Sequence, residues 1–277
     1  MRVFTGRSEL EVRVWGEGEP ILSIHGSFLG EWFHPLLQEP ALDGYQRIAY
    51  WRHGYRHSSH PDGPPYPVDS VVDDAFQVLH QAGGGPGHVV AHSLGAIYAY
   101  QLVLSHPESV RTLTLIEPAA PTPEAFQWMA ETQEQVQVAA TEGDFNTVCH
   151  ILLSHAHGDE NYRSVLDPWL PDDWFEQAAA DNVAGLTVEL PAVGEWKFGP
   201  EEAQSIQCPV LLIRGDRSPW VFPANVRHLK EWIPHAQEHL VPGAGHFELM
   251  TQPAETAEAL ASFISSHSIG DSAESGQ

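Results

Sequence analysis

A chain of 277 residues is long enough to bury a full hydrophobic core, as one large domain or as a domain that carries an insertion. Hydrophobic residues make up 42% of the sequence and charged residues 18%, a globular composition that excludes a disordered chain. The formal net charge of −24 at pH 7 argues against nucleic acid and against an anionic membrane surface as partners, because like charges repel.

The location predicted from the sequence is the cytoplasm. Cys149 and Cys208 are too few for a disulfide framework in a chain of this size, so we expect free thiols in a reducing compartment. The first residues lack the apolar core and the cleavage signature of a signal peptide, and no apolar run reaches the length of a membrane span.

The first 120 residues alternate short runs of β-formers with helical spacing of apolar residues, which predicts an α/β fold with a mostly parallel sheet covered on both faces. The expected elements are a hairpin at 2–15, strands at 20–24, 46–51, 88–91 and 110–116, and helices at 68–80 and 97–104. Ligands of such sheets bind at the carboxyl ends of the strands. The loops that begin at His25, Arg52, Ser93 and Glu117 are expected there.

From residue 121 to residue 202 the alternation is lost, and helical stretches (126–140 and 145–153) alternate with turns that carry Pro and Trp. We interpret 121–202 as a helical cap inserted into a core domain formed by residues 1–120 and 203–268. The α/β alternation resumes with strands at 209–214 and 238–241 and helices at 224–232 and 253–267. Residues 269–277 are polar and small, and we expect a flexible C-terminal tail.

Ser93 lies where a run of β-formers stops and helix-favouring residues follow at once. So sharp a corner holds a serine in a sparsely allowed backbone conformation, and the residues two positions away on either side must be small, as Ala91 and Gly95 are. The start of a helix beneath the hydroxyl stabilises negative charge. Ser93 is therefore a candidate nucleophile; the alternative is an ordinary strand-to-helix turn in which Gly95 eases packing.

Acyl transfer through a serine also needs a histidine base, a carboxylate that orients it and donors for the oxyanion. His246 follows a Gly-rich loop after the last predicted strand and is the candidate base; the alternative is a loop histidine without a role. The backbone N–H groups of Leu94 and of Ser27 or Phe28 are candidates for the oxyanion hole, since Gly26 brings bare backbone close to the site.

A set of motifs in a fixed order resembles the α/β-hydrolase superfamily over residues 20 to about 265. The motifs are His25-Gly26-Ser27-Phe28, Arg52-His53-Gly54-Tyr55 with Ser58, Ala91-His92-Ser93-Leu94-Gly95, the run from Pro209 to Asp216, and Gly243-Ala244-Gly245-His246. The resemblance implies an eight-stranded, mostly parallel sheet flanked by helices, with the inserted cap and no cofactor. It also gives the family's nucleophile, base and oxyanion roles to Ser93, His246, Leu94 and Ser27.

The triad acid departs from the usual family pattern. Many members place it three residues after the glycine that ends the seventh strand, which here is Ser218, and a serine carries no negative charge. The candidates are Glu117, after the strand that follows the nucleophile helix, where haloalkane dehalogenases and some other relatives supply their acid, and Asp216. We favour Glu117, because the family's sheet sets its strand between those that carry Ser93 and Ser218. The alternative for Glu117 is a strand-end acid that holds a neighbouring loop.

A serine at position 93 disfavours the reactions of haloalkane dehalogenases and related epoxide hydrolases, which need a carboxylate nucleophile. An activated serine suits esters, lactones and thioesters. The prediction is a serine hydrolase, a monomer or homodimer, that cleaves a carboxylic ester or lactone of a hydrophobic small molecule through an acyl-enzyme. The alternatives are a cofactor-independent oxygenase, lyase or C–C bond hydrolase on the same Ser/His pair, and a non-catalytic ligand receptor.

Aromatic side chains are the candidates for substrate contacts. Phe28 and Trp32 lie near the predicted oxyanion loop, and Trp128 belongs to the cap, where Trp169, Trp174 and Trp196 also occur. Each tryptophan of the cap either lines an apolar pocket or packs the cap against the core. His92 is expected to pack under the turn or to line the pocket. The spacing of His53, His57 and His60 fits no compact ligand motif, so no metal site is predicted.

Overall fold

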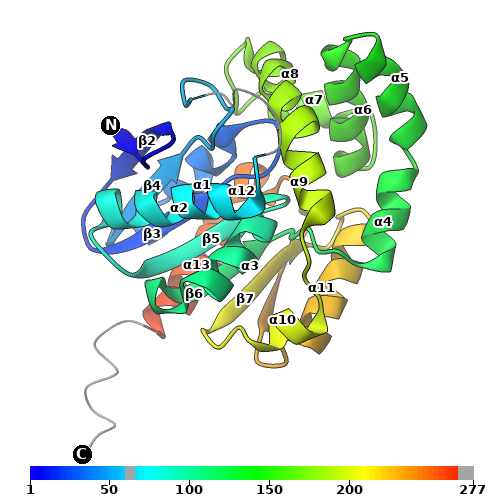
Figure 1. The fold of residues 1–277 in the computed structure, drawn as a ribbon. Coiled ribbons are helices and arrows are strands. Elements are labelled where there is room, and N and C mark those ends of the chain that lie inside the picture. Colours follow the sequence, from blue (N-terminus) through cyan, green and yellow to red (C-terminus); the bar gives the residue numbers. More distant parts are fainter. Residues whose placement is uncertain (60–65, 268–277) are drawn as a thin grey trace, which may run out of the picture.

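An eight-stranded sheet forms the centre of the molecule in the computed structural model, which describes residues 1–59 and 66–267 (Figure 1). From edge to edge its order is β1-β2-β4-β3-β5-β6-β7-β8; β2 pairs antiparallel with β1 and β4, and the other neighbours are parallel. The strands are β1 (Arg2–Phe4), β2 (Glu9–Trp15), β3 (Glu19–Ile24), β4 (Tyr45–Tyr50), β5 (Gly87–His92), β6 (Val110–Ile116), β7 (Val210–Gly215) and β8 (Gln237–Val241). The predicted α/β sheet is confirmed. The predicted tail, 269–277, lies outside the described residues.

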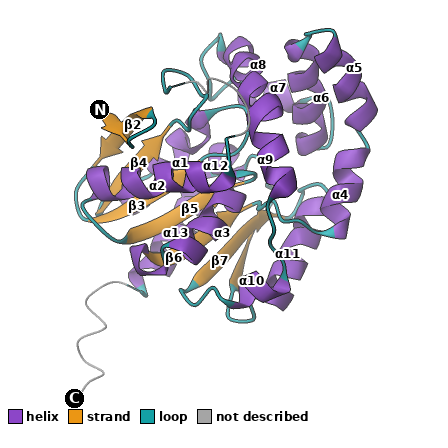
Figure 2. Ribbon diagram, viewed as in Figure 1, coloured by secondary structure: helices purple, strands orange, loops and turns teal. Residues whose placement is uncertain are grey.

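Helices cover both faces of the sheet (Figure 2). One face packs against α2 (Val68–Gly83), α3 (Gly95–Ser105) and α11 (Val221–Trp232), and the other against α1 (His34–Leu37) and α13 (Pro253–Ser265). Side chains of the strands alternate between the two cores: on β5, Val89 and Ala91 join the first and Val90 the second. Every residue of β5 is buried, which explains its apolar run. Shorter elements are η1 (Gly30–Phe33), η2 (Pro40–Leu42), η3 (Pro107–Ser109), α10 (Pro200–Gln204) and α12 (Glu248–Thr251).

A helical insertion separates β6 from β7 and gathers on one side of the sheet (Figure 1). It contains α4 (Pro123–Ala130), α5 (Gln133–Thr141), α6 (Phe145–His157), α7 (Tyr162–Leu166), α8 (Trp174–Ala184), a π-helical segment (Gly185–Glu189) and α9 (Leu190–Glu195). The helix predicted over 126–140 is two helices, interrupted at Glu131-Thr132, where a β-branched residue disfavours helix. The cap boundaries at 121 and 202 stay predictions. No helix in residues 1–59 and 66–267 is long and apolar enough to cross a membrane.

The turn from β5 into α3 depends on a close approach between backbones. Ser93 has a φ of +51°, a left-handed conformation that is uncommon for residues other than glycine. Its N–H donates to the carbonyl of Ile116 at 3.1 Å, which ties the turn to the end of β6. A Cβ atom at Gly95 would lie 2.3 Å from the carbonyl oxygen of Ile24 and 2.7 Å from that of His25. Only glycine fits at this position.

We predict that Gly95→Ala destabilises the protein by about 3 kcal/mol, because the added methyl group meets rigid backbone atoms. The matched control is Gly194→Ala in α9, where a Cβ has no neighbour within 4 Å and the substitution is expected to stabilise the helix by up to about 1 kcal/mol. Urea unfolding of both variants measures the difference. Equal free energies of unfolding for the two variants would contradict the close approach.

Candidate active site

Three side chains from distant parts of the chain meet at the carboxyl ends of the strands. The Oγ atom of Ser93 lies 3.2 Å from Nε2 of His246, and Nδ1 of His246 lies 3.4 Å from Oε2 of Glu117. Ser93 follows β5, Glu117 follows β6, and His246 lies in the loop after β8. Glu117 and His246 are 0% and 4% exposed, whereas Ser93 is half-buried, so Ser93 is the least buried residue of the three. Both contacts are long, as is common before a substrate binds.

Two donors hold the Glu117 carboxylate in place. Its Oε1 atom accepts the backbone N–H of Gly215 at 2.7 Å and the hydroxyl of Ser218 at 2.6 Å, which leaves Oε2 to face His246. The backbone of Glu117 has a φ of +47°. Asp216 is exposed and accepts the N–H of Gly243 at 2.7 Å, so it fastens the loop that leads to His246. Of the two candidate acids, the structure brings Glu117 to the histidine.

A second buried carboxyl lies beside Glu117. Glu248 begins α12, two residues after His246, and is completely buried. Burial, and then the neighbouring Glu117, raise the pKa of Glu248 well above its usual value. Burial also raises the pKa of Glu117, but its hydrogen bonds from Ser218 and Gly215 act in the opposite direction and stabilise the anion. We infer that Glu248 holds the proton and Glu117 the negative charge.

His246 is a neutral imidazole at neutral pH. Burial, and then the nearby His157, lower its pKa to about 3, so the ring is unprotonated and one of its nitrogens has a free lone pair. The ring of Phe222 stacks on it with centroids 4.0 Å apart. Beneath it, Nε2 of His92 donates to the carbonyl of His246 at 3.0 Å. Because His92 is 1% exposed, the structure places it under the base and not on an open surface.

The loop after β3 comes closest to the serine at Gly26, where a Cβ atom would lie 3.0 Å from the Cβ of Ser93. The carbonyl of Ser27 accepts Nε1 of Trp32 at 2.6 Å and the N–H of Leu29 at 3.0 Å, so the loop is fixed from behind. Phe28 follows with a φ of +75°, a conformation that costs energy in any residue with a side chain.

In the described ranges the amides of Ser27, Phe28 and Leu94 donate to no acceptor of the protein. Leu94 directly precedes α3, and Ser27 directly follows the close approach at Gly26. The candidate oxyanion donors and the serine therefore belong to two loops that touch.

The aromatic side chains predicted to contact the substrate differ in how far they are buried. Trp32 is 2% exposed and stacks on Phe247 with centroids 5.3 Å apart, so it supports the oxyanion loop. Trp128 is half-buried and meets Phe222, the ring that covers His246, edge-on at 5.8 Å. Phe28 is 8% exposed. Among the other tryptophans of the cap, Trp174 is buried in the core, Trp196 stacks on Tyr100 and Phe198, and Trp169 is 45% exposed.

Three contributors were missed at the sequence level. Ser218 cannot itself be the acid, but its hydroxyl donates to Glu117, the candidate acid. The sequence does contain a signal for Glu248, because this residue follows the candidate base by two positions. Phe222 had none, because its position at the start of α11 becomes informative only when that helix is placed next to His246.

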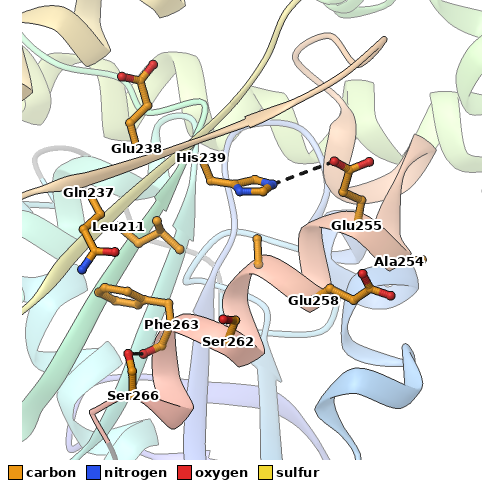
Figure 3. Close-up of a pocket in the computed structure, with 11 residues that line it drawn as sticks. Leu211, Gln237, Glu238, His239, Ala254, Glu255, Glu258, Ser262, Phe263 and Ser266 are labelled. Atoms are coloured by element: carbon orange, nitrogen blue, oxygen red, sulfur yellow. Dashed lines mark hydrogen bonds and ion pairs between the residues drawn. The ribbon is translucent and has the colours of Figure 1, made fainter.

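A groove described in the structure lies away from this centre, and the described residues offer no metal site. Among residues 1–59 and 66–267 no three His, Cys, Asp or Glu side chains are placed to hold a metal ion, and His60 lies outside these ranges. An open groove of about 720 Å³ lies between β8 and α13. At its edge His239 faces Glu255 (Figure 3), with Nε2 and Oε1 4.0 Å apart. None of the residues that line it belongs to the centre at Ser93, so we do not assign it the chemistry of the serine.

Comparison with known proteins agrees with the fold. A model of the alpha/beta hydrolase fold family matches residues 19–253. The 2-(acetamidomethylene)succinate hydrolase of Mesorhizobium japonicum is 25% identical over 275 residues, which are 95% of this chain and 94% of that protein. The structure of Est816, described as an N-acyl homoserine lactone degrading enzyme, has a TM-score of 0.74 at 21% identity and covers 95% of this chain and 100% of its own. A thermophilic esterase from Thermogutta terrifontis has a TM-score of 0.77 at 17% identity, with coverages of 97% and 99%.

The lowered pKa of a buried histidine, His92, predicts how the free energy of unfolding depends on pH. Burial, and then His246, lower the pKa of His92 to about 3, below the ordinary value of 6.5. Between these values the unfolded chain binds a proton that the folded protein does not, so the stability contributed by neutral His92 is lost as the pH falls. We predict that His92→Gln, which keeps a donor for His246, removes a slope of up to about 1.4 kcal/mol per pH unit below pH 6. Urea unfolding at pH 7, 6 and 5 measures it; parallel profiles for the two proteins would contradict the prediction.

Proposed function

The chain belongs to the alpha/beta hydrolase fold family, and we propose that it is a serine hydrolase that cleaves a carboxylic ester or lactone of a hydrophobic small molecule. The observation that carries the proposal is the continuous contact from Ser93 through His246 to Glu117, in which Ser93 is the least buried residue. Neutral His246 accepts a proton, and buried Glu117 faces its other nitrogen. This is the arrangement that turns a weakly acidic hydroxyl into a nucleophile.

In the proposed mechanism, Oγ of Ser93 attacks the substrate carbonyl while Nε2 of His246 takes its proton. The oxyanion is held by the N–H of Leu94 and that of Ser27 or Phe28. His246 then gives its proton to the departing alkoxide, which leaves an acyl-enzyme on Ser93. A water molecule that loses a proton to His246 attacks the acyl carbon; the bond to Oγ of Ser93 then breaks, His246 returns the proton to that oxygen, and the acid is released. Glu117 keeps the imidazole in the productive tautomer and stabilises its charged form.

The substrate class is argued from what surrounds the serine. Phe28 belongs to the oxyanion loop, and Trp128 meets Phe222, the ring that stacks on His246; we assign Phe28 and Trp128 to contacts with an apolar substrate. The names of the similar proteins support hydrolysis and include an esterase and a lactone degrading enzyme. The net charge of −24 favours an uncharged substrate over an anionic one. A cytoplasmic location and a monomeric or homodimeric state remain our predictions from the sequence.

We predict that Ser93→Ala lowers kcat for p-nitrophenyl esters by about 10³-fold or more, because the nucleophile is lost while binding is retained. The control is Ser105→Ala at the end of α3, where the serine is exposed and remote from the base. Release of p-nitrophenolate measures both variants. Turnover of Ser93→Ala at the rate of the control would exclude the proposed mechanism.

Two matched variants, in each of which an amide replaces a carboxylate, test which residue is the acid. Glu117→Gln should lower kcat by about 10²-fold or more, because the positive imidazole that forms during the reaction then lacks its counter-charge. Asp216→Asn should lower it by about threefold or less, since this side chain contacts only the loop before His246. The same ester assay compares them, and the reverse ranking would make Asp216 the acid.

A further inference from the structure

A buried ion pair joins the helical insertion to the core close to the candidate oxyanion loop. The guanidinium of Arg52, in the loop after β4, contacts the carboxylate of Glu189 with Nη1 and Oε1 at 2.5 Å and Nη2 and Oε2 at 3.4 Å. The two side chains are 0% and 4% exposed. Neither belongs to the triad, and a pair so deeply buried contributes little net stability, because both charges lose their water. Its position next to the site therefore needs another explanation.

Arg52 also fixes the carbonyl of Gly26. Its Nη2 atom donates to that oxygen at 2.9 Å, and its backbone N–H donates to Nε2 of His25 at 3.0 Å. Because Nε2 of His25 accepts, its Nδ1 atom carries the proton and donates to the same carbonyl at 2.8 Å. In a trans peptide the carbonyl of Gly26 and the N–H of Ser27 point in opposite directions. Fixing the carbonyl therefore aims the amide that we propose as an oxyanion donor.

Glu189 reaches Arg52 from the π-helical segment, an irregularity that is rare in helices and frequent at functional sites. The hydroxyl of Tyr55 donates to Oε2 of Glu189 at 2.9 Å and accepts from Nη2 of Arg52 at 3.1 Å. Gly185, at the start of the segment, lies against this cluster, since a Cβ there would be in van der Waals contact with the Tyr55 hydroxyl at 3.6 Å. A single carboxylate on the insertion thus orders two side chains of the core.

The charges in this cluster are maintained. Burial alone would lower the pKa of Arg52, but Glu189 and then the surrounding tyrosines raise it, so the guanidinium stays charged. Burial, and then Glu189, raise the pKa of Tyr55 well above its usual value, so the phenol keeps the proton that it donates. With a neutral partner at position 189, the Arg52 charge would be left buried and uncompensated, and the guanidinium would turn toward other acceptors or water.

We propose that Glu189 is a positioning residue that couples the docked insertion to the oxyanion hole: its ion pair with Arg52 orients the Gly26–Ser27 peptide, so the hole is complete only while the insertion is docked. The proposal rests on the proposed function. Oxyanion donors act on the transition state. The proposal therefore predicts that Glu189, which touches neither the substrate nor the triad, affects kcat and not ground-state binding.

The test compares Glu189→Gln, which keeps the shape and removes the charge, with Glu195→Gln, an exposed glutamate in the adjoining helix α9. For p-nitrophenyl ester hydrolysis by the full chain, we expect Glu189→Gln to lower kcat by about 10-fold or more, with KM changed less than threefold. The inhibition constant of a trifluoromethyl ketone, which forms an oxyanion on the serine, should rise by the same factor. Glu195→Gln should match the wild type in all three quantities.

Tyr55→Phe provides a milder second variant, because it removes one donor to Glu189 and keeps the ion pair. We expect a fall in kcat of about threefold at constant KM, and this variant decides the outcome if Glu189→Gln does not fold. An unchanged kcat in the folded variants, or equal losses in kcat and in binding of a product acid, would overturn the proposal. Lack of ester hydrolysis by the wild type would instead overturn the proposed function.

Discussion

The proposed triad of Ser93, His246 and Glu117 depends on the negative charge of Glu117, which is buried away from water. Glu117 is completely buried, and burial favours its protonated form, which would be useless to the neighbouring histidine. The structure opposes this with two hydrogen bonds to one carboxylate oxygen, from Gly215 and Ser218. The pKa of neighbouring Glu248 is raised well above its usual value, and we infer that Glu248 holds the proton of the pair. The anion is thereby available to His246, and through it to Ser93.

The proposed acid, Glu117, directly follows β6, and the order of the sheet makes that possible. β6 lies between the strand that precedes Ser93 and the strand that ends at Gly215, so the residue after it lies beside both strand ends. The residue at the family's usual acid position, Ser218, donates its hydroxyl to the relocated carboxylate, so this position supports the acid without carrying a charge itself. The uncharged Ser218 after β7 and the carboxylate of Glu117 after β6 therefore act together.

Much of the architecture could be predicted from the sequence, because it rests on local patterns. The alternation of apolar runs and helical spacing indicated the α/β sheet and its elements along the chain, and the small residues around Ser93 indicated the sharp turn. The choice of Glu117 over Asp216 rested on the strand order of the family that the sequence resembles, and only the side-chain contacts show which carboxylate faces His246. Arg52 and Glu189 are 137 residues apart, so no local pattern connects them.

The central claim is that Ser93 is made reactive by its neighbours, and a covalent probe tests it most directly. The protein is incubated with a fluorophosphonate, digested, and the modified peptide identified by tandem mass spectrometry. The account predicts one phosphonyl adduct, on Ser93, that is formed by the folded protein and is lost after denaturation. An unmodified Ser93 in the folded protein, or an adduct confined to another serine, would contradict it.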